Sequence, residues 1–325
     1  MTETTVAPAA KAYKSRSQLA DFFTRLVKKK PLGLAGGIIV LLLLLVAVIG
    51  PLIAPFPWDE IHTVDKLTSP NSQYLLGTDN IGRDLLSRII RGARISIYVG
   101  LGASALNVLI ATSIGMFSGY FGGKLDIIVQ RFVDALLTFP MLIIVITLMN
   151  LIGTGITQVI IVLGIWGGIG WIRVVRSAVI SIRQNVYIEA ARAIGCSTSK
   201  MVTRHILPNI TPVMIVIFSV AMSGNILGEA SLSFLGFGIP PPEPSWGGML
   251  SGEGRQYMYE APWLAVWPGV ALSIAVYGIN MWGDAVRDLL DPRLRGGVGR
   301  YGSIGGKRIK GDKGKKQQNA TEVAQ

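Results

Sequence analysis

The sequence is poor in charge, in cysteine and in histidine. Charged residues make up 15% of the 325 positions, whereas a soluble domain carries about 25%. Cys196 is the single cysteine, so an intrachain disulfide is excluded. The two histidines, His62 and His205, fall in polar connecting segments. An ordinary water-soluble domain and a disulfide scaffold are therefore excluded, and we expect no metal ion or haem on this chain.

Long apolar runs are present instead. Half of the residues are hydrophobic and the mean hydropathy is +0.49. Residues 32–54 hold no charge, and at about 1.5 Å per residue a helix of this length crosses the roughly 30 Å hydrocarbon layer. The run is longer than the core of a cleaved signal peptide, about 7 to 15 residues. We therefore interpret it as a retained membrane helix.

Five further apolar runs predict an all-α membrane protein with six transmembrane helices. They cover residues 95–116, 127–151, 157–175, 210–235 and 263–282. Pro140 lies inside the third run and predicts a kink there. Glycines recur at four-residue spacing, which favours close approach of two helices in lipid, although lipid-facing glycine is an alternative. These glycines are Gly115, Gly119 and Gly123 in one run and Gly164 and Gly168 in another.

The distribution of basic residues predicts the orientation. Residues 11–30 hold seven lysines or arginines, residues 307–316 hold six, and the connection over residues 173–204 holds six. Basic segments stay in the cytoplasm, so both termini and this connection are predicted to be cytoplasmic. The tails are expected to contact anionic lipid headgroups. The net charge of +12 thus follows from membrane topology, and we predict no binding of nucleic acid.

These observations divide the chain into four parts. Residues 1–30 form a cytoplasmic tail, residues 31–92 the first helix and an external loop, residues 93–288 a five-helix core, and residues 289–325 a basic cytoplasmic tail. The external loop is predicted to contain a short amphipathic helix on the outer membrane surface, starting at Leu85. The same loop departs from the charge rule. It holds Arg83, Arg88, Arg91 and Arg94, offset only by Asp79 and Asp84.

The cytoplasmic connection over residues 181–209 predicts a bent pair of short helices. Its apolar residues at i, i+3, i+4 and i+7 form one helical stripe, which lies either on the membrane or against another protein. The stripe is Tyr187, Ala190, Ala191 and Ile194. Asn185 is predicted to cap the first helix and Gly195 to end it in a left-handed conformation. Ser197 or Thr198 is predicted to cap the second helix, which should end at Pro208.

This connection resembles the coupling motif of the permease subunits of bacterial ATP-binding-cassette (ABC) importers. The motif begins with Glu189-Ala190-Ala191, continues with three residues and Gly195, and ends after nine more in His205-Ile206-Leu207-Pro208. The family pattern has an aliphatic residue where His205 stands. The ending with histidine is similar to the variant of this motif in the dipeptide, oligopeptide and nickel branch of the family. Residues 76–88 and 232–238, the latter followed by four prolines and Trp246, resemble two other motifs of that branch.

The resemblance covers residues 32–295 and implies a type I ABC importer permease fold in the inner membrane. It implies a second, homologous permease, an extracytoplasmic solute-binding protein, and two cytoplasmic ATPases that carry ATP and magnesium. The implied substrates are dipeptides or oligopeptides, or related solutes such as nickel chelates. The implied ATPase-docking residues are Glu189, Ala190, Ala191, Gly195, Leu207 and Pro208.

No catalytic residue is predicted on the chain itself. Residues 119–125 differ from a phosphate-binding loop, because Ser118 replaces its first glycine and Leu125 its final serine or threonine. An intramembrane serine protease would need a base, and no histidine falls in a predicted span. We therefore expect a transport subunit and not an enzyme.

Polar residues inside the spans are few. Asn225 and Glu229 lie four residues apart on one face of the fifth predicted helix, and polar groups in lipid need a partner or a pore. They either line a solute path or form structural hydrogen bonds. An ion-coupled secondary transporter is the alternative function, but it would show two inverted repeats, and none is evident.

Overall fold

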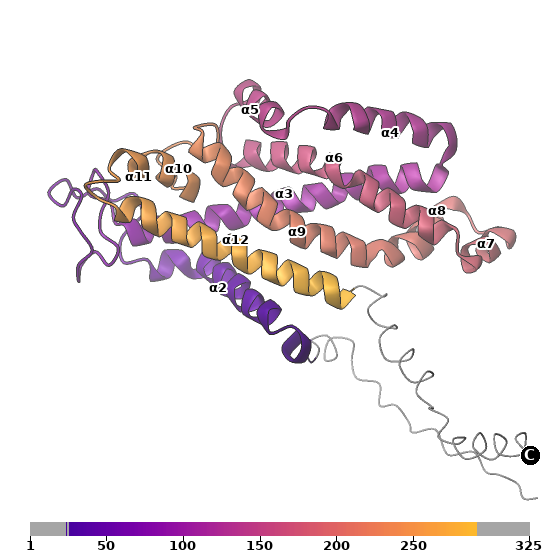
Figure 1. The fold of residues 1–325 in the computed structure, drawn as a ribbon, viewed down its shortest axis with the longest axis horizontal. Coiled ribbons are helices and arrows are strands. Elements are labelled where there is room, and N and C mark those ends of the chain that lie inside the picture. The colour runs from indigo at the N-terminus through magenta and orange to yellow at the C-terminus, as the bar shows by residue number, and fades with distance from the viewer. Residues whose placement is uncertain (1–23, 25, 291–325) are drawn as a thin grey trace, which may run out of the picture. The chain divides into compact units, whose positions relative to one another are not determined.

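The protein is described by a computed structural model that covers residue 24 and residues 26–290, and these residues form a helical bundle. Most of both basic tails lies outside the described residues. The long helices are α2 (Pro31–Ile53), α3 (Leu85–Phe121), α6 (Ile156–Arg183), α9 (Leu207–Phe234) and α12 (Trp263–Leu290), as Figure 1 shows. The shorter elements are α4 (Gly123–Leu137), α5 (Met141–Ile152), α7 (Val186–Ala193), α8 (Thr198–Lys200), the π-helix η1 (Met201–Ile206), α10 (Trp246–Ser251) and α11 (Glu253–Gln256).

The predicted number of spans agrees with the helices. Within the described residues, α2, α3, α6, α12 and the continuous stretch Thr198–Phe234 are each long and apolar enough to cross a membrane. The helices α4 and α5 pass the same test as a pair and are bent by 86° between them. The kink predicted at Pro140 is therefore a complete break. Pro140 precedes α5, where its ring and its missing N–H end the hydrogen-bond ladder of the preceding helix.

The predicted surface helix at Leu85 is wrong as a separate element. Leu85 instead begins α3, which runs unbroken for 37 residues. The Asp84 side chain caps this helix by accepting a hydrogen bond from the backbone N–H of Ser87 at 2.8 Å. No proline interrupts the following residues up to Phe121. A single helix therefore carries the amphipathic segment and the second predicted span.

Close packing of α3 against α6 depends on the glycines. A Cβ at Gly115 would lie 2.6 Å from the carbonyl oxygen of Ile172, and one at Gly119 would lie 2.9 Å from that of Arg176. The predicted close approach is therefore confirmed at these positions, where dispersion forces hold helices together in lipid. Gly123 does not continue the stripe. It begins α4 with a positive φ of 59° and would meet nothing within 4 Å.

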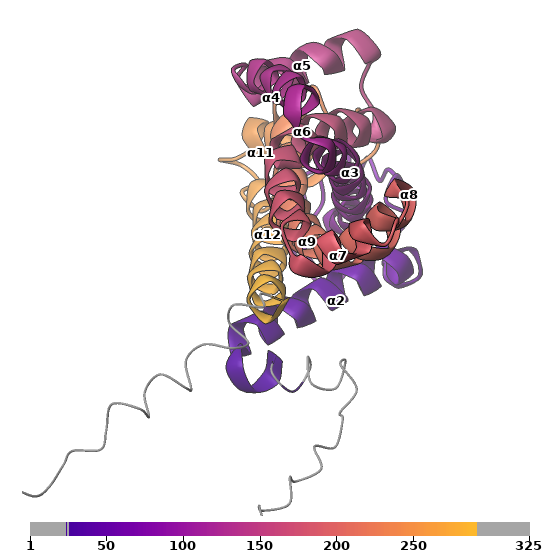
Figure 2. The same cartoon turned by 90° about the vertical axis from the view of Figure 1, so that its right-hand side faces the viewer.

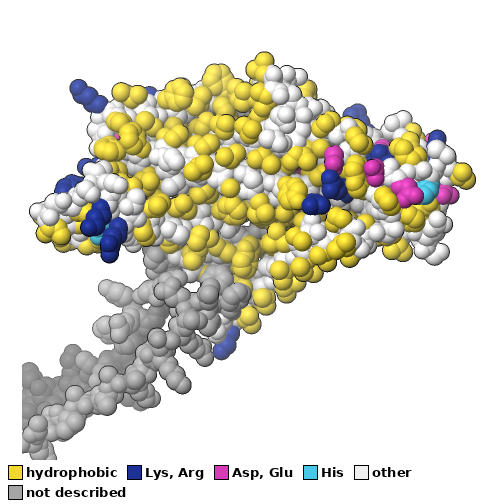
Figure 3. Space-filling view, turned by 180° about the vertical axis from the view of Figure 1, so that it is seen from behind, with side chains coloured by type: hydrophobic (Ala, Val, Ile, Leu, Met, Phe, Trp, Pro, Cys, Tyr) yellow, Lys and Arg dark blue, Asp and Glu magenta, His cyan; other side chains and the backbone are white. Residues whose placement is uncertain are grey.

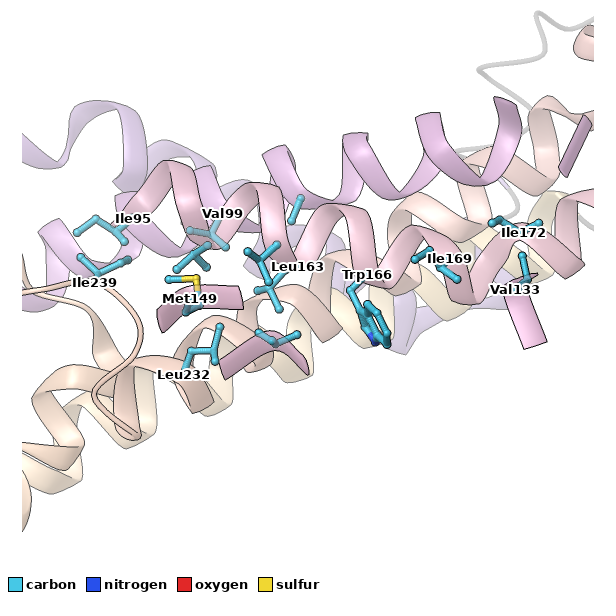
Figure 4. Packing of buried hydrophobic residues seen from close by; sticks show 14 residues of the cluster. Ile95, Val99, Val133, Met149, Leu163, Trp166, Ile169, Ile172, Leu232 and Ile239 are labelled. Atoms are coloured by element: carbon cyan, nitrogen blue, oxygen red, sulfur yellow. The ribbon is translucent and has the colours of Figure 1, made fainter. Parts of the chain in front are cut away.

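The helices α3, α6 and α9 form the centre of the bundle. Seen end-on in Figure 2, α4 and α5 lie outside α6, and α2 lies at the opposite edge. Figure 4 shows how the central core is filled, with Ile95 and Val99 of α3 facing Leu163 of α6 and Leu232 of α9. Met149 inserts from α5 into the same cluster and is fully buried. The bent pair α4 and α5 thus packs against α6 through apolar contacts.

The surface supports a lipid environment. Figure 3 shows hydrophobic side chains spread over the middle of the molecule, with charged side chains gathered towards its ends. The outward face of α2 illustrates this, because Leu52 is 86% exposed and Val48 74%. Large apolar side chains at this exposure are expected to face acyl chains, since no other described part of the chain covers them.

Candidate functional site

The connection between α6 and α9 forms an elbow of α7, α8 and η1 at one end of the bundle (Figure 1). Gly195 adopts the predicted left-handed conformation, with φ of 82°, and its N–H donates to the carbonyl of Arg192 at 3.0 Å. Asn185 stands at the start of α7 but does not cap it. Its amide instead donates to the carbonyls of Ser181 and Ile182 at the end of α6. The bend is therefore fixed by the end of α6 on one side and by Gly195 on the other.

The second half of the elbow is not a separate helix. Ser197 precedes α8 without a side-chain cap, and the chain then passes through the π-turn of η1 directly into α9. Pro208, predicted to end the helix, lies in the first turn of α9. Pro208 directly follows the wide turn of η1, so the hydrogen-bond ladder is already irregular where the proline N–H is missing. The elbow is therefore continuous with α9.

The elbow has one buried and one exposed face. Ile188, Ala191, Met201 and Ile206 are buried in a cluster with Val175 and Val179 of α6. On the other face, Ile194 is 87% exposed and Val186 80%. Of the predicted docking residues, Glu189, Ala190, Gly195 and Pro208 are exposed, Leu207 is half-buried and Ala191 is buried. The predicted stripe is thus divided, with Ala191 holding the elbow to the bundle and the remaining members facing outward.

The predicted pore residues lie inside the bundle. The Asn225 amide donates to Ser104 Oγ at 3.0 Å and to Asn107 Oδ1 at 2.9 Å, and the Asn107 amide donates to carbonyls of α6. Glu229 is fully buried and accepts a hydrogen bond from Ser233 Oγ at 2.7 Å. The contacts of Asn225 and Asn107 join α9, α3 and α6, as expected if these polar residues form structural hydrogen bonds. Lining of a solute path stays a prediction.

The other end of the bundle holds a buried ionic network. Arg83 donates to Asp79 at 2.5 Å and to Glu253 of α11 at 2.6 Å, and Arg88 lies 3.7 Å from Asp79. Burial is the largest cause that raises the pKa of Glu253, and the two arginines oppose this shift. Glu253 was not predicted as a partner of Arg83, because the two residues lie 170 positions apart in the sequence. No local pattern could reveal a partner at that separation.

A second ion pair involves another of the four arginines that depart from the positive-inside rule. Arg91 binds Glu243 of the proline-rich segment at 2.9 Å. Three of the four arginines that were predicted to be external, Arg83, Arg88 and Arg91, therefore have carboxylates nearby, two of which, Glu243 and Glu253, come from the distant segment between α9 and α12.

The sequence matches known families over most of its length. The profile of the family described as binding-protein-dependent transport system inner membrane component matches residues 111–296. A second profile, the N-terminal transmembrane domain of oligopeptide transport permease C, matches residues 17–70.

Relatives and one solved structure agree with these profiles. The chain is 35% identical over 288 residues to the dipeptide transport system permease protein DppC of Alkalihalophilus pseudofirmus, covering 89% of this chain and 94% of that protein. It is 35% identical to the glutathione transport system permease protein GsiD of Pectobacterium atrosepticum, covering 86% and 93% of the two chains. A structure of the MetNI methionine ABC transporter in an inward-facing conformation matches with a TM-score of 0.52 at 20% identity, over 63% of this chain and 96% of the other. That structure supports the fold.

Proposed function

The chain belongs to the family of binding-protein-dependent transport system inner membrane components, and from this we infer that it forms one half of a membrane path for small peptides, driven by ATPases that dock on the elbow. It is a multi-pass permease of the inner membrane and has the type I ABC importer permease fold. The ion-coupled secondary transporter is not supported by these relationships.

The exposed face of the elbow is the observation that carries the docking proposal. Ile194 and Val186 are large, apolar and almost free of contacts, although the opposite face of the same helix is packed against α6. Apolar side chains at such exposure mark a protein or membrane contact. The neighbouring Glu189 and Arg192 give the face charges of both signs, which suit a specific protein register.

The coupling follows from the continuity of the elbow with α9. Closure of two cytoplasmic ATPases on ATP and magnesium would displace the elbow, and α9 would move with it because η1 continues into α9 without a break in the helix. Such a movement changes the access of the bundle from one side of the membrane to the other. In this arrangement both termini and the elbow are cytoplasmic.

Small peptides are the proposed substrate. Relatives at 35% identity are named as dipeptide and glutathione permeases, and glutathione is itself a modified tripeptide. The complete machine would contain a second, homologous permease and an extracytoplasmic binding protein that delivers the peptide. This chain would contribute no covalent chemistry.

The experiment places a charge on the exposed face. Ile194→Glu leaves the packed face of α7 intact, so the variant is expected to fold and to lose co-purification with the ATPases and ATP-dependent peptide uptake in proteoliposomes. Val64→Glu is the matched control, since Val64 is also an exposed β-branched residue, at 94%, in the loop at the other end of the bundle. Normal ATPase binding and uptake by Ile194→Glu would contradict the docking proposal.

A further inference from the structure

A cavity of about 430 Å³ lies where α2 ends and α3 begins, at the end of the bundle opposite the elbow. Its apolar wall includes Pro51, Ala54 and Ile90, and its polar wall includes Trp58, Asp59, Arg91 and Arg94. A cavity of this size is ample for a small polar group. Neither the elbow nor Asn225 and Glu229 take part in it.

Arg94 is the cation in this cavity that lacks an acidic partner. Arg91 is already bound to Glu243, and its guanidinium lies 5.4 Å from the ring centre of Trp58. Arg94 donates to the hydroxyl of Tyr98 at 2.9 Å, and no carboxylate lies within ion-pair distance of it among residues 26–290. Of the four arginines between residues 83 and 94, Arg94 is therefore the one whose charge no carboxylate of the described residues compensates.

Asp59 supplies an opposite charge on the same wall. It is exposed, lines the cavity and forms no ion pair with another described residue. The cavity thus presents one guanidinium and one carboxylate that form no ion pair, although Arg94 contacts Tyr98 and Asp59 lies close enough to Arg91 to interact with its charge. A ligand that carries both an anion and a cation matches this pair, whereas a purely anionic ligand would be repelled by Asp59.

The position of the cavity indicates the membrane interface. It opens at the last turn of α2, whose neighbouring residues Val48 and Leu52 are highly exposed and apolar. Tyr98, 47% exposed, and Trp58 flank the two arginines, and such aromatic residues are enriched where the hydrocarbon layer meets the headgroups. An acyl chain lying along α2 would therefore bring its headgroup to the cavity.

We propose that this cavity binds the headgroup of a zwitterionic aminophospholipid, with the phosphate against Arg94, the ammonium against Asp59 and the acyl chains along α2. Arginine suits a phosphate because its planar guanidinium donates two parallel hydrogen bonds. The bound phosphate would also neutralise Arg94, which no carboxylate of the described residues pairs with. This inference requires only that the chain is embedded in a membrane and does not depend on the transported solute.

The test uses the full-length chain purified with its partner subunits and examined by native mass spectrometry. Dioleoyl phosphatidylethanolamine and dioleoyl phosphatidylglycerol are added separately at equal concentration. The wild type is expected to retain phosphatidylethanolamine preferentially, and Arg94→Gln to lower its retention on the order of tenfold, the effect of losing one charge-assisted contact. Asp59→Asn should abolish the preference between the two lipids. Arg255→Gln, at an exposed arginine in α11, is the matched control and should bind like the wild type.

Three results would overturn the proposal. The first is that Arg94→Gln retains the same lipid as Arg255→Gln. The second is that soluble phosphoethanolamine displaces the lipid at equal concentration, which would assign the site to a free phosphate ester. The third is that Arg94→Gln loses the solute-binding protein while its lipid retention is unchanged, which would assign the surface to a protein. Should Arg94→Gln fail to fold, the exposed substitution Asp59→Asn tests the proposal by itself. An unchanged preference for phosphatidylethanolamine over phosphatidylglycerol in that variant would overturn it.

Discussion

The guanidinium of Arg83 donates to the carboxylate of Glu253 at 2.6 Å, although 170 positions separate the two residues. The same guanidinium binds the fully buried Asp79. Arg83 therefore connects the turn that precedes α3 with α11. Together with the Arg91–Glu243 pair, this side chain holds the region before and at the start of α3 against the segment between α9 and α12, at the end of the bundle opposite the elbow.

Arg83→Gln is predicted to be far more destabilising than Glu253→Gln. Removing the arginine leaves the buried carboxylate of Asp79 and the partly buried carboxylate of Glu253 with only Arg88 nearby, and an unpaired buried charge costs about 3–5 kcal/mol. Removing the carboxylate of Glu253 also removes its burial cost and its repulsion by Asp79, which together outweigh the attraction of the arginines. The measurement is thermal unfolding of both variants in one detergent, with Arg255→Gln as the exposed control. Equal losses in the two variants would contradict this account of the network.

The ionic network also predicts the direction in which the stability of the protein changes with pH. Because burial raises the pKa of Glu253 above its ordinary 4.5, the folded state binds its proton more tightly than the unfolded state. The stabilisation from this group is complete below its unfolded-state pKa and is lost as the pH rises through the folded-state pKa. The stability of the wild type relative to Glu253→Gln should therefore decrease from pH 4 upwards. Unfolding midpoints of both proteins at successive pH values measure this, and an increasing difference would show that the pKa is lowered instead.

The apolar runs allowed most of the fold to be predicted, because lipid requires each span to satisfy its own backbone. Six runs correspond to five long helices and one bent pair within residues 26–290. The boundaries of the helices were harder to predict. Leu85 begins a helix ten residues before the apolar run at Ile95, since the amphipathic first turns are buried by α10 and not by lipid. Hydropathy cannot distinguish these two environments.

The candidate site was predicted in type and in part of its geometry. Gly195 was identified because few residues other than glycine accept a left-handed end to a helix. The continuation through Pro208 was missed because a proline ends a helix or begins one depending on the preceding turn, and the π-turn of η1 has no local signal. The carboxylates Glu243 and Glu253 were missed for a different reason, which is that ion pairs across more than 150 residues depend on tertiary structure.

The close packing of α3 on α6 predicts a position-specific effect of alanine. Gly115→Ala places a Cβ 2.6 Å from the carbonyl oxygen of Ile172 and 3.0 Å from the Cβ of Val175. The backbone of α6 must move, and overpacking of this kind costs about 1–3 kcal/mol. Gly170→Ala is the control within α6, because a Cβ there meets nothing within 4 Å, and the better helix propensity of alanine should leave it neutral or slightly stabilised. The unfolding midpoint of Gly115→Ala should therefore lie below that of Gly170→Ala, and equal midpoints would contradict the glycine contact.

Gly195 offers a test that separates backbone strain from docking. A Cβ at this position meets nothing within 4 Å, so Gly195→Leu strains only the left-handed backbone, by about 1–2 kcal/mol. Gly236, at the end of α9, has a similar φ of 84° against 82°, the same pattern of backbone hydrogen bonds at a helix end and equally empty surroundings. Gly236→Leu should thus lose about the same stability without touching the elbow.

The two leucine variants are therefore expected to unfold at similar temperatures and to differ in function. Gly195→Leu should lose ATPase association or hydrolyse ATP without peptide uptake, because its new side chain changes the bend that presents Ile194 and Ala190. Gly236→Leu should keep ATPase association and coupled uptake close to those of the wild type. If both variants transport normally, the bend at Gly195 has no part in coupling. If both fail equally, the loss reflects backbone strain and the elbow is not the place where the ATPases act.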